Sequence, residues 1–332
     1  MIGNLQVLRF LAATGVVVLH SNAEIMGRHT EFYGVAVFFV LSGYVMSMVS
    51  DRSASSFMLD RMWRIIPAYW IAMAIFVIVL KAWNSTTWTH IILSALFIPH
   101  EEPNAGYFPA LGVGWTLNME MYFYTVFAIA ILIRRKAAPA IAAVIVLAIA
   151  WILPLVTTNG PVLHYYTHEY LYYFVFGIAA WYVMNWLAPK LPAVTSPRWV
   201  FPLAIAVFAA LTLMGVNEFV IVPALVLAAL LTSKLGADIQ SKQLLLLGAA
   251  SYGCYLLHTI LLSILRAMGI EISGSVTFTL MILIVAWTSA VIWYLTVERG
   301  IGLLHRRSRT WRRKTATVPV TEAPDPDRHD VR

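Results

Sequence analysis

The chain has 332 residues, of which 60% are hydrophobic and only 12% are charged. Soluble domains carry roughly 25% charged residues, so this composition excludes a water-soluble protein and predicts an all-α integral membrane protein. The formal net charge of +7 fits cytoplasmic loops that face anionic lipid, and it gives no reason to expect a nucleic acid partner. The single cysteine, Cys254, excludes an intrachain disulfide.

Apolar runs of about 20 residues can cross the ~30 Å hydrocarbon core of a bilayer as helices. We expect about ten such spans, at residues 5–24, 33–50, 66–83, 115–133, 138–157, 170–187, 200–216, 219–234, 244–267 and 276–297. The first run has no clear small-residue cleavage site and is therefore interpreted as a helix rather than a signal peptide. The stretch "HIILSALFIPH", which lies between the third and fourth spans, is too short to cross and is expected to be re-entrant or interfacial.

Basic residues accumulate on one side of these spans. With the N-terminus inside, the cytoplasmic segments contain Arg52, Arg61, Arg64, Arg134, Arg135, Lys136, Lys190, Arg198, Lys234 and Lys242, followed by a basic tail. The opposite side has only Arg28, Lys81 and Arg266. This positive-inside bias predicts that both termini are cytoplasmic. We expect residues 1–300 to form the transmembrane domain and residues 301–332 to form a basic and then disordered tail.

The first span contains the stretch "LRFLAATGVVVLH", which places Arg9 and His20 in an otherwise apolar helix. The two residues are eleven positions apart, close to three helical turns, so they share one face at a separation of ~16 Å along the axis. His20 should therefore lie in the outer third of the bilayer. Ionisable residues in the membrane usually face a cavity or a partner. The alternative is structural: Arg9 extends to the interface and His20 caps a packed helix.

The stretch "GWTLNMEMYFY" places Glu120 about five residues into a helix that enters from the outer side. Its expected depth of ~8 Å matches that of His20. A carboxylate at that position could fix the tautomer of the imidazole and raise its basicity. The alternative is that Glu120 reaches water at the helix end.

The stretch "FMLDRMWRIIPAYW" contains Arg61 and Arg64, three residues apart and thus neighbours on a helix surface, just before Pro67. Two guanidinium groups at the cytoplasmic start of a helix can bind phosphates in a bidentate manner. The alternative is that both arginines belong to the general excess of basic residues in cytoplasmic segments and bind no ligand.

Other candidate groups have weaker support. Ser42 inside the second span is disfavoured as a nucleophile. Cys254 and His258, four residues apart in "SYGCYLLH", could form a nucleophilic pair, but Cys254 is better interpreted as a small buried hydrophobe. His164 and His168 have a metal-like spacing without an evident third ligand, so no metal site is expected.

Taken together, four stretches resemble the membrane acyltransferase-3 family. They are "LRFLAATGVVVLH", "GVAVFFVLSGYV", "RMWRIIPAYW" and "GWTLNMEMYFY", and "SYGCYLLH" is a weaker late match. Each motif is modest alone, but their order and spacing are specific. The form "GVGWTLNMEMYFY" is similar to that of members that acylate bacterial exopolysaccharides. The chain shows no appended SGNH-type hydrolase domain and is therefore expected to be a stand-alone member.

The resemblance implies transfer of an acyl group, often acetyl, from acyl-CoA to an extracytoplasmic sugar at the bacterial inner membrane. Acyl-CoA would be a co-substrate, no cofactor would be permanently bound, and the partners would be a polysaccharide or lipid-linked glycan and membrane lipid. In this scheme His20 is the general base and Glu120 orients it, and a covalent acyl-His20 intermediate is the alternative to direct transfer. The expected donor-binding residues are Arg9, Arg61 and Arg64. The candidates for the acceptor or oxyanion site are Trp115 and Asn118.

A secondary transporter or flippase-like carrier would also place His, Glu and Arg in the membrane. Such proteins often contain sequence repeats and helices broken by Gly or Pro at matching positions. Neither feature is clear in this sequence, and the arginine pair suits a nucleotide-bearing donor, so the enzyme is favoured.

Overall fold

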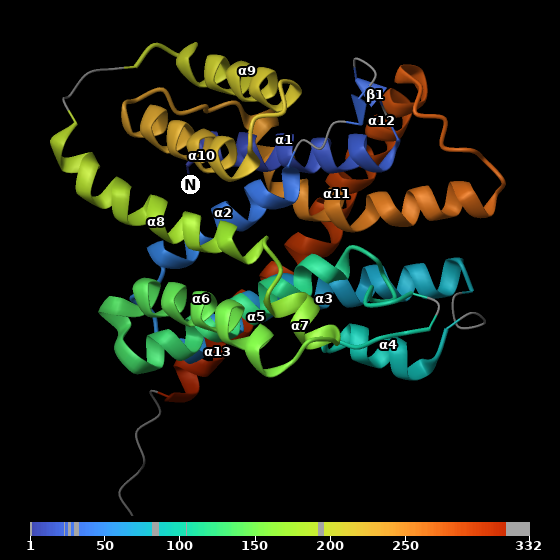
Figure 1. The fold of residues 1–332 in the computed structure, drawn as a ribbon, viewed down its shortest axis with the longest axis horizontal. Coiled ribbons are helices and arrows are strands. Elements are labelled where there is room, and N and C mark those ends of the chain that lie inside the picture. Colours follow the sequence, from blue (N-terminus) through green and yellow to red (C-terminus); the bar gives the residue numbers. More distant parts are fainter. Residues whose placement is uncertain are drawn as a thin grey trace, which may run out of the picture.

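The computed structural model describes residues 2–22, 24–25, 28–29, 33–81, 86–103, 105–191 and 196–316. This part of the chain folds as a bundle of helices (Figure 1). A short antiparallel hairpin, β1 (Glu24–Ile25) and β2 (Arg28–His29), follows the first helix.

A helix lies at each of the ten expected positions. These helices are α1 (Gly3–His20), α2 (Gly34–Met48), α3 (Ala54–Val79), α5 (Gly114–Arg134), α6 (Ala138–Val156), α8 (Leu171–Leu187), α9 (Val200–Leu213), α10 (Glu218–Lys234), α11 (Lys242–Ala267) and α12 (Val276–Trp293). Within the described ranges, six helical segments are long and apolar enough to cross a membrane, and α2 and α9 are shorter apolar helices. The protein is thus a multi-pass helical membrane protein, as the composition predicted.

Short elements connect the long helices. They are α4 (Trp88–Ala95), η2 (Arg135–Ala137), α7 (Pro161–Tyr166), η3 (Ala188–Lys190) and the π-helix η4 (Tyr294–Glu298), which continues into α13 (Arg299–Ala316). With eight residues, α4 is too short to span a bilayer. The predicted basic tail is helical as far as Ala316, and the rest of the predicted disordered segment lies outside the described residues.

The start of α3 differs from the sequence-based expectation. The helix begins at Ala54 rather than near residue 66, and the Ser53 hydroxyl caps it by accepting a hydrogen bond from the Ser56 amide at 3.3 Å. The expectation that Arg61 and Arg64 mark the helix start was wrong, because both lie two to three turns inside α3. Hydropathy places the start too late because this amphipathic first part of the helix is polar on one side.

The N-terminus of α1 is fixed by a buried polar anchor. The Asp238 carboxylate accepts hydrogen bonds from the Gly3 and Asn4 amides at 2.9 and 3.0 Å, where a negative charge is favourable to a helix dipole. The Asn4 side chain is fully buried; it donates to Ala229, Thr232 and Ala237 in the region of α10 and accepts from the Ile239 amide. These bonds fix α1 against the end of α10.

Small residues allow α2 and α8 to cross at close range. A Cβ atom added to Gly43 of α2 would lie 2.1 Å from the Phe174 carbonyl oxygen of α8, and one added to Gly177 of α8 would lie 2.1 Å from the Val40 carbonyl oxygen of α2. Side chains at these positions would therefore push α2 and α8 apart.

The helices form two groups that face each other (Figure 1). In this view α1, α2, α9, α10, α11 and α12 occupy the upper half, whereas α3, α4, α5, α6, α7 and α13 occupy the lower half. The element η4 carries the chain from the first group to the second, where α13 packs against α3.

Candidate active site

A cavity of about 390 Å³ lies between the two groups of helices. The upper group contributes side chains of α1, α2 and α11, and the lower group contributes side chains of α3 and α5. The lining residues of α2 extend from Val35 to Met48, and this length of helix rises by ~20 Å. The cavity is therefore elongated and suits a long, narrow ligand better than a compact one.

Three arginines and one glutamate line this cavity. They are Arg9 of α1, Arg61 and Arg64 of α3 and Glu120 of α5. The four side chains interact electrostatically, and the arginines outnumber the carboxylate, so the cavity has a positive surplus. Arg64 is exposed, whereas the Nε atom of Arg61 is buried and has no hydrogen-bond partner among the described residues. The structure thus unites the predicted donor-binding residues in one cavity.

Glu120 is held by partners other than the predicted one. Its Oε1 atom accepts hydrogen bonds from the Ser42 hydroxyl at 2.9 Å and from the Tyr124 hydroxyl. These two bonds connect Glu120 with α2 and with its own helix rather than with His20, so an orienting role toward His20 stays a prediction from the sequence. Ser42, disfavoured as a nucleophile, is a hydrogen-bond donor to Glu120. Tyr124 was missed, although its position four residues after Glu120 on one helix face could have indicated the contact.

His20 is the last residue of α1 and lies outside the lining of the cavity. Its Nδ1 atom is 2.8 Å from the Val16 carbonyl oxygen. Because a carbonyl oxygen can only accept, Nδ1 carries the hydrogen and Nε2 of the neutral ring carries the lone pair. The residue as a whole is exposed at the end of the helix.

Two aromatic contacts connect His20 with the end of the cavity. The ring of His20 packs against that of His258 of α11, and the ring centroids are 5.1 Å apart. His258 in turn contacts Tyr255, which lines the cavity and lies 5.8 Å away by the same measure. Arg9 and Tyr255 line the cavity, and the ring contacts of Tyr255 with His258 and of His258 with His20 extend from it to the end of α1.

Comparison with known proteins identifies the type of enzyme to which this geometry belongs. The model of the acyltransferase-3 family, described as an acyltransferase domain, matches residues 2–297. The chain belongs to the acyltransferase-3 family. The exopolysaccharide production protein ExoZ of Rhizobium meliloti (strain 1021) is 31% identical over 315 residues, which cover 90% of this chain and 98% of ExoZ. No solved structure matches the chain significantly. The family resemblance and the enzyme class predicted from the sequence are confirmed.

The acyltransferase has a second carboxylate close to its arginines that the sequence analysis missed. Glu298 ends the π-helix η4 and interacts electrostatically with Arg9 and Arg64. Its Oε1 atom is buried without a hydrogen-bond partner among the described residues. Short π-helical segments occur frequently at functional sites, and a glutamate directly after the last predicted span was the available signal.

The two candidates for the acceptor side, Trp115 and Asn118, lie on α5 but do not line the cavity. The half-buried Trp115 ring contacts His168 and Tyr170, with both centroid distances 5.7 Å. Asn118 is buried, and its Oδ1 atom has no hydrogen-bond partner in the described part of the chain. The neighbours of Trp115 along the chain, Thr116 and Leu117, do line the cavity.

The remaining candidates, His164, His168 and Cys254, pack against other side chains and lie outside the cavity lining. The rings of His164 and His168 lie 5.9 Å apart at their centroids, and the Cys254 side chain is fully buried in an apolar cluster. Over the residues that the structure describes, no group of His, Cys, Asp and Glu side chains could hold a metal ion.

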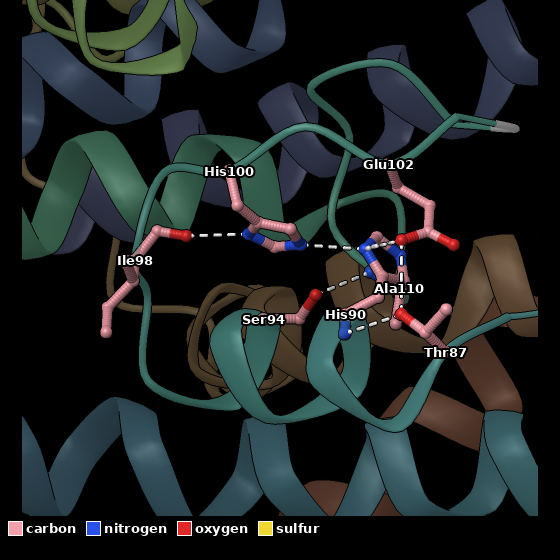
Figure 2. A network of polar contacts seen from close by, with 7 residues as sticks. All are labelled: Thr87, His90, Ser94, Ile98, His100, Glu102 and Ala110. Carbon is pink, nitrogen blue, oxygen red and sulfur yellow. Dashed lines mark hydrogen bonds and ion pairs between the residues drawn. The ribbon is translucent and has the colours of Figure 1, made fainter.

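A polar network fixes the segment that follows α3 (Figure 2). The Thr87 hydroxyl caps α4 by accepting from the His90 amide at 3.1 Å, and it donates to Glu102 at 3.2 Å. The His90 Nδ1 and His100 Nε2 atoms are 2.7 Å apart. Because His100 Nδ1 donates to a backbone carbonyl, His90 is the donor in this pair. Burial, supported by the nearby His100, lowers the pKa of His90, so the network is built around a neutral imidazole.

Proposed function

We propose that this acyltransferase transfers an acyl group, in the first instance acetyl, from acyl-CoA to a hydroxyl of a bacterial exopolysaccharide or its lipid-linked precursor. Family membership supplies the reaction type. The similarity to a protein named for exopolysaccharide production supports a polysaccharide acceptor. We further propose that the enzyme resides in the bacterial inner membrane.

The observation that carries this proposal is the elongated cavity with its three arginines. CoA combines several phosphate groups with a long, narrow pantetheine arm, and it therefore needs positive charge at one end of an extended site. Arg9, Arg61 and Arg64 offer that charge, and guanidinium groups match phosphate oxygens in a bidentate manner. The rest of the lining is largely apolar and aromatic, which suits the arm.

His20 is proposed as the general base. The sugar hydroxyl oxygen attacks the thioester carbonyl carbon while His20 Nε2 accepts the hydroxyl proton. The tetrahedral intermediate then collapses, the C–S bond breaks, and the departing CoA sulfur takes the proton from His20. The Val16 carbonyl supports this role because it keeps Nδ1 protonated and directs the lone pair to Nε2.

Glu120 is proposed to act on the donor side rather than through His20. Bound to Ser42 and Tyr124, it fixes the wall of the cavity and offsets part of the arginine charge. Trp115 and Asn118 remain proposals for the acceptor side, with Asn118 as a candidate donor to the developing oxyanion.

The proposed topology has ten spans, with both termini in the cytoplasm. It follows from the distribution of basic loops and is supported by the match between expected and observed helices. Residues 1–300 would then be the transmembrane acyltransferase domain and residues 301–332 a cytoplasmic tail. In this arrangement the donor arginines are nearer the inner face, and His20 is at the outer end of α1.

Mass spectrometry of surface polysaccharide provides the test. A deletion strain should lose an acyl mass increment, which the wild-type gene restores and the His20→Ala variant does not. Loss of a general base typically costs 10²–10⁴-fold in rate. Near-normal acylation by a well-folded His20→Ala protein would refute the role of His20. Unchanged glycan masses in the deletion strain would refute the polysaccharide acceptor.

Oriented vesicles test the transbilayer arrangement separately. Acetyl-CoA is confined to one side and the glycan to the other, and acylation is expected only when acetyl-CoA faces the side of the α2–α3 loop. Activity with both substrates restricted to that side would contradict the scheme.

A further inference from the structure

His258 is a fully buried imidazole that the mechanism above does not use. It lies on α11 directly beside the proposed base, and its ring is tilted by 56° against the ring of His20 at a centroid distance of 5.1 Å. On the cavity side it contacts Tyr255, whose hydroxyl is 2.6 Å from that of Thr116. His258 therefore contacts both His20 and a residue of the cavity lining.

The hydrogen bonds of His258 define its protonation. Its Nδ1 atom is 3.2 Å from the Cys254 carbonyl oxygen, and this acceptor requires that Nδ1 carry the hydrogen. The Nε2 atom then carries a lone pair, and it is buried without a hydrogen-bond partner among the described residues. A buried polar atom without a partner destabilises the folded state, so its presence needs a physical reason.

We propose that His258 is a positioning residue for the base: it fixes the His20 ring and stabilises its protonated form during acyl transfer. This inference rests on the proposed function. When His20 accepts the hydroxyl proton it becomes a cation, and a neutral imidazole with an uncommitted lone pair favours a cation beside it. His258 exchanges no proton in this step, since its Nδ1 hydrogen remains on the Cys254 carbonyl. The proton returns from His20 to the departing sulfur.

The other described side chains named here around His20 and His258 are either uncharged or already hydrogen-bonded. The ionisable neighbours on α11 are Cys254 and Tyr255, and Tyr255 is engaged with Thr116. From α2 the nearby ring is Phe38, which contacts Tyr255, and from α12 the nearby polar group is Thr279, which is bonded to Ser21. Neither of these carries a charge.

The carboxylate on the cavity side of the pair is also committed elsewhere. Glu120 interacts electrostatically with Tyr255, and it is already bound by the hydroxyls of Ser42 and Tyr124. Among the described groups named here around the pair, the Nε2 lone pair of His258 is thus the acceptor without a hydrogen-bond partner.

The test measures incorporation of radiolabelled acetyl-CoA into polysaccharide by membranes that contain the full chain, as a function of pH. His258→Phe keeps a ring of similar size but removes the lone pair, whereas His258→Gln keeps a hydrogen-bond acceptor. We expect His258→Phe to lower the maximal rate by about tenfold or more and to shift the acidic limb of the pH–rate profile to lower pH, by about one unit. His258→Gln should restore part of both. The control is His164→Phe, which removes an exposed imidazole far along the chain from His20 and should leave the profile unchanged.

Each outcome decides between defined alternatives. Active wild-type membranes together with an unshifted acidic limb in His258→Phe would overturn the inference and leave the proposed function intact. Inactive wild-type membranes would overturn the proposed function, and the inference with it. If His258→Phe does not accumulate in the membrane, His258→Asn, whose shorter amide cannot reach the position of Nε2, is compared with His258→Gln. Identical rates and profiles for those two variants would also overturn the inference.

Discussion

Replacing Arg61 by alanine tests the donor site most directly. Arg61 lines the cavity together with Arg9 and Arg64, and its buried Nε atom has no hydrogen-bond partner among the described residues. A bound phosphate would supply the missing acceptor. The variant is therefore expected to weaken binding of acetyl-CoA without preventing insertion of the protein into the membrane.

The magnitude follows from the bonds that are lost. A hydrogen bond to a charged group contributes roughly 1.5–3 kcal/mol, and each 1.4 kcal/mol corresponds to tenfold in affinity. The dissociation constant of acetyl-CoA should therefore rise by about 10- to 150-fold in Arg61→Ala. Arg61→Lys keeps the charge but lacks the Nε–H donor and the planar fork, so its loss should lie at the lower end of this range.

The assay is titration of the purified protein with acetyl-CoA and, separately, with a pantetheine fragment that lacks the phosphates of CoA. The control is Arg135→Ala, which removes the same charge from an exposed position in η2, away from the cavity. Only acetyl-CoA should lose affinity in Arg61→Ala, and the control should bind both ligands normally. Wild-type affinity for acetyl-CoA in Arg61→Ala, or an equal loss for the fragment, would refute the reasoning.

Three further predictions concern the fold. Gly177→Leu should reduce the free energy of unfolding by about 1–3 kcal/mol in an SDS titration, because even a Cβ atom there would lie 2.1 Å from a carbonyl oxygen of α2. Gly300→Ala, where a Cβ atom meets nothing within 4 Å, is the control, and equal effects would contradict the packing argument. Asn4→Ala should cost about 2–4 kcal/mol because it leaves several buried backbone and hydroxyl groups unpaired, whereas the exposed Asn159→Ala should be neutral. Burial lowers the pKa of His90, so the folded state binds its proton less well than the unfolded state does. The contribution of this neutral imidazole to the free energy of unfolding is fully present above the pKa of histidine in the unfolded chain, about 6.5, and it decreases as the pH drops below that pKa. Hydrogen exchange in residues 86–103 should accelerate selectively on acidification, and exchange independent of pH after correction for the intrinsic rate would show that His90 does not control the segment.

The sequence by itself determined the class of protein and much of its anatomy. Hydrophobic runs of the length of a bilayer located ten helices, because in a membrane the backbone must satisfy its hydrogen bonds within each helix. The order of the motifs was sufficient to recognise the family. Arg9 and Glu120 were selected from the cost of placing ionisable groups in an apolar segment, and Arg61 and Arg64 were selected from their spacing at an expected cytoplasmic helix start. All four line one cavity.

Tertiary structure alone decided which of these side chains meet. Helical rise gives the depth of a residue along one axis, and by depth His20 and Glu120 looked like partners. Contact also depends on which helices are neighbours and how each is rotated, and these are set by close packing at small residues such as Gly43 and by buried anchors such as Asn4. That packing places Glu120 beside Ser42 and places His20 beside His258. Neither contact is encoded in local spacing, because each joins helices that are distant along the chain and come together only when the bundle forms.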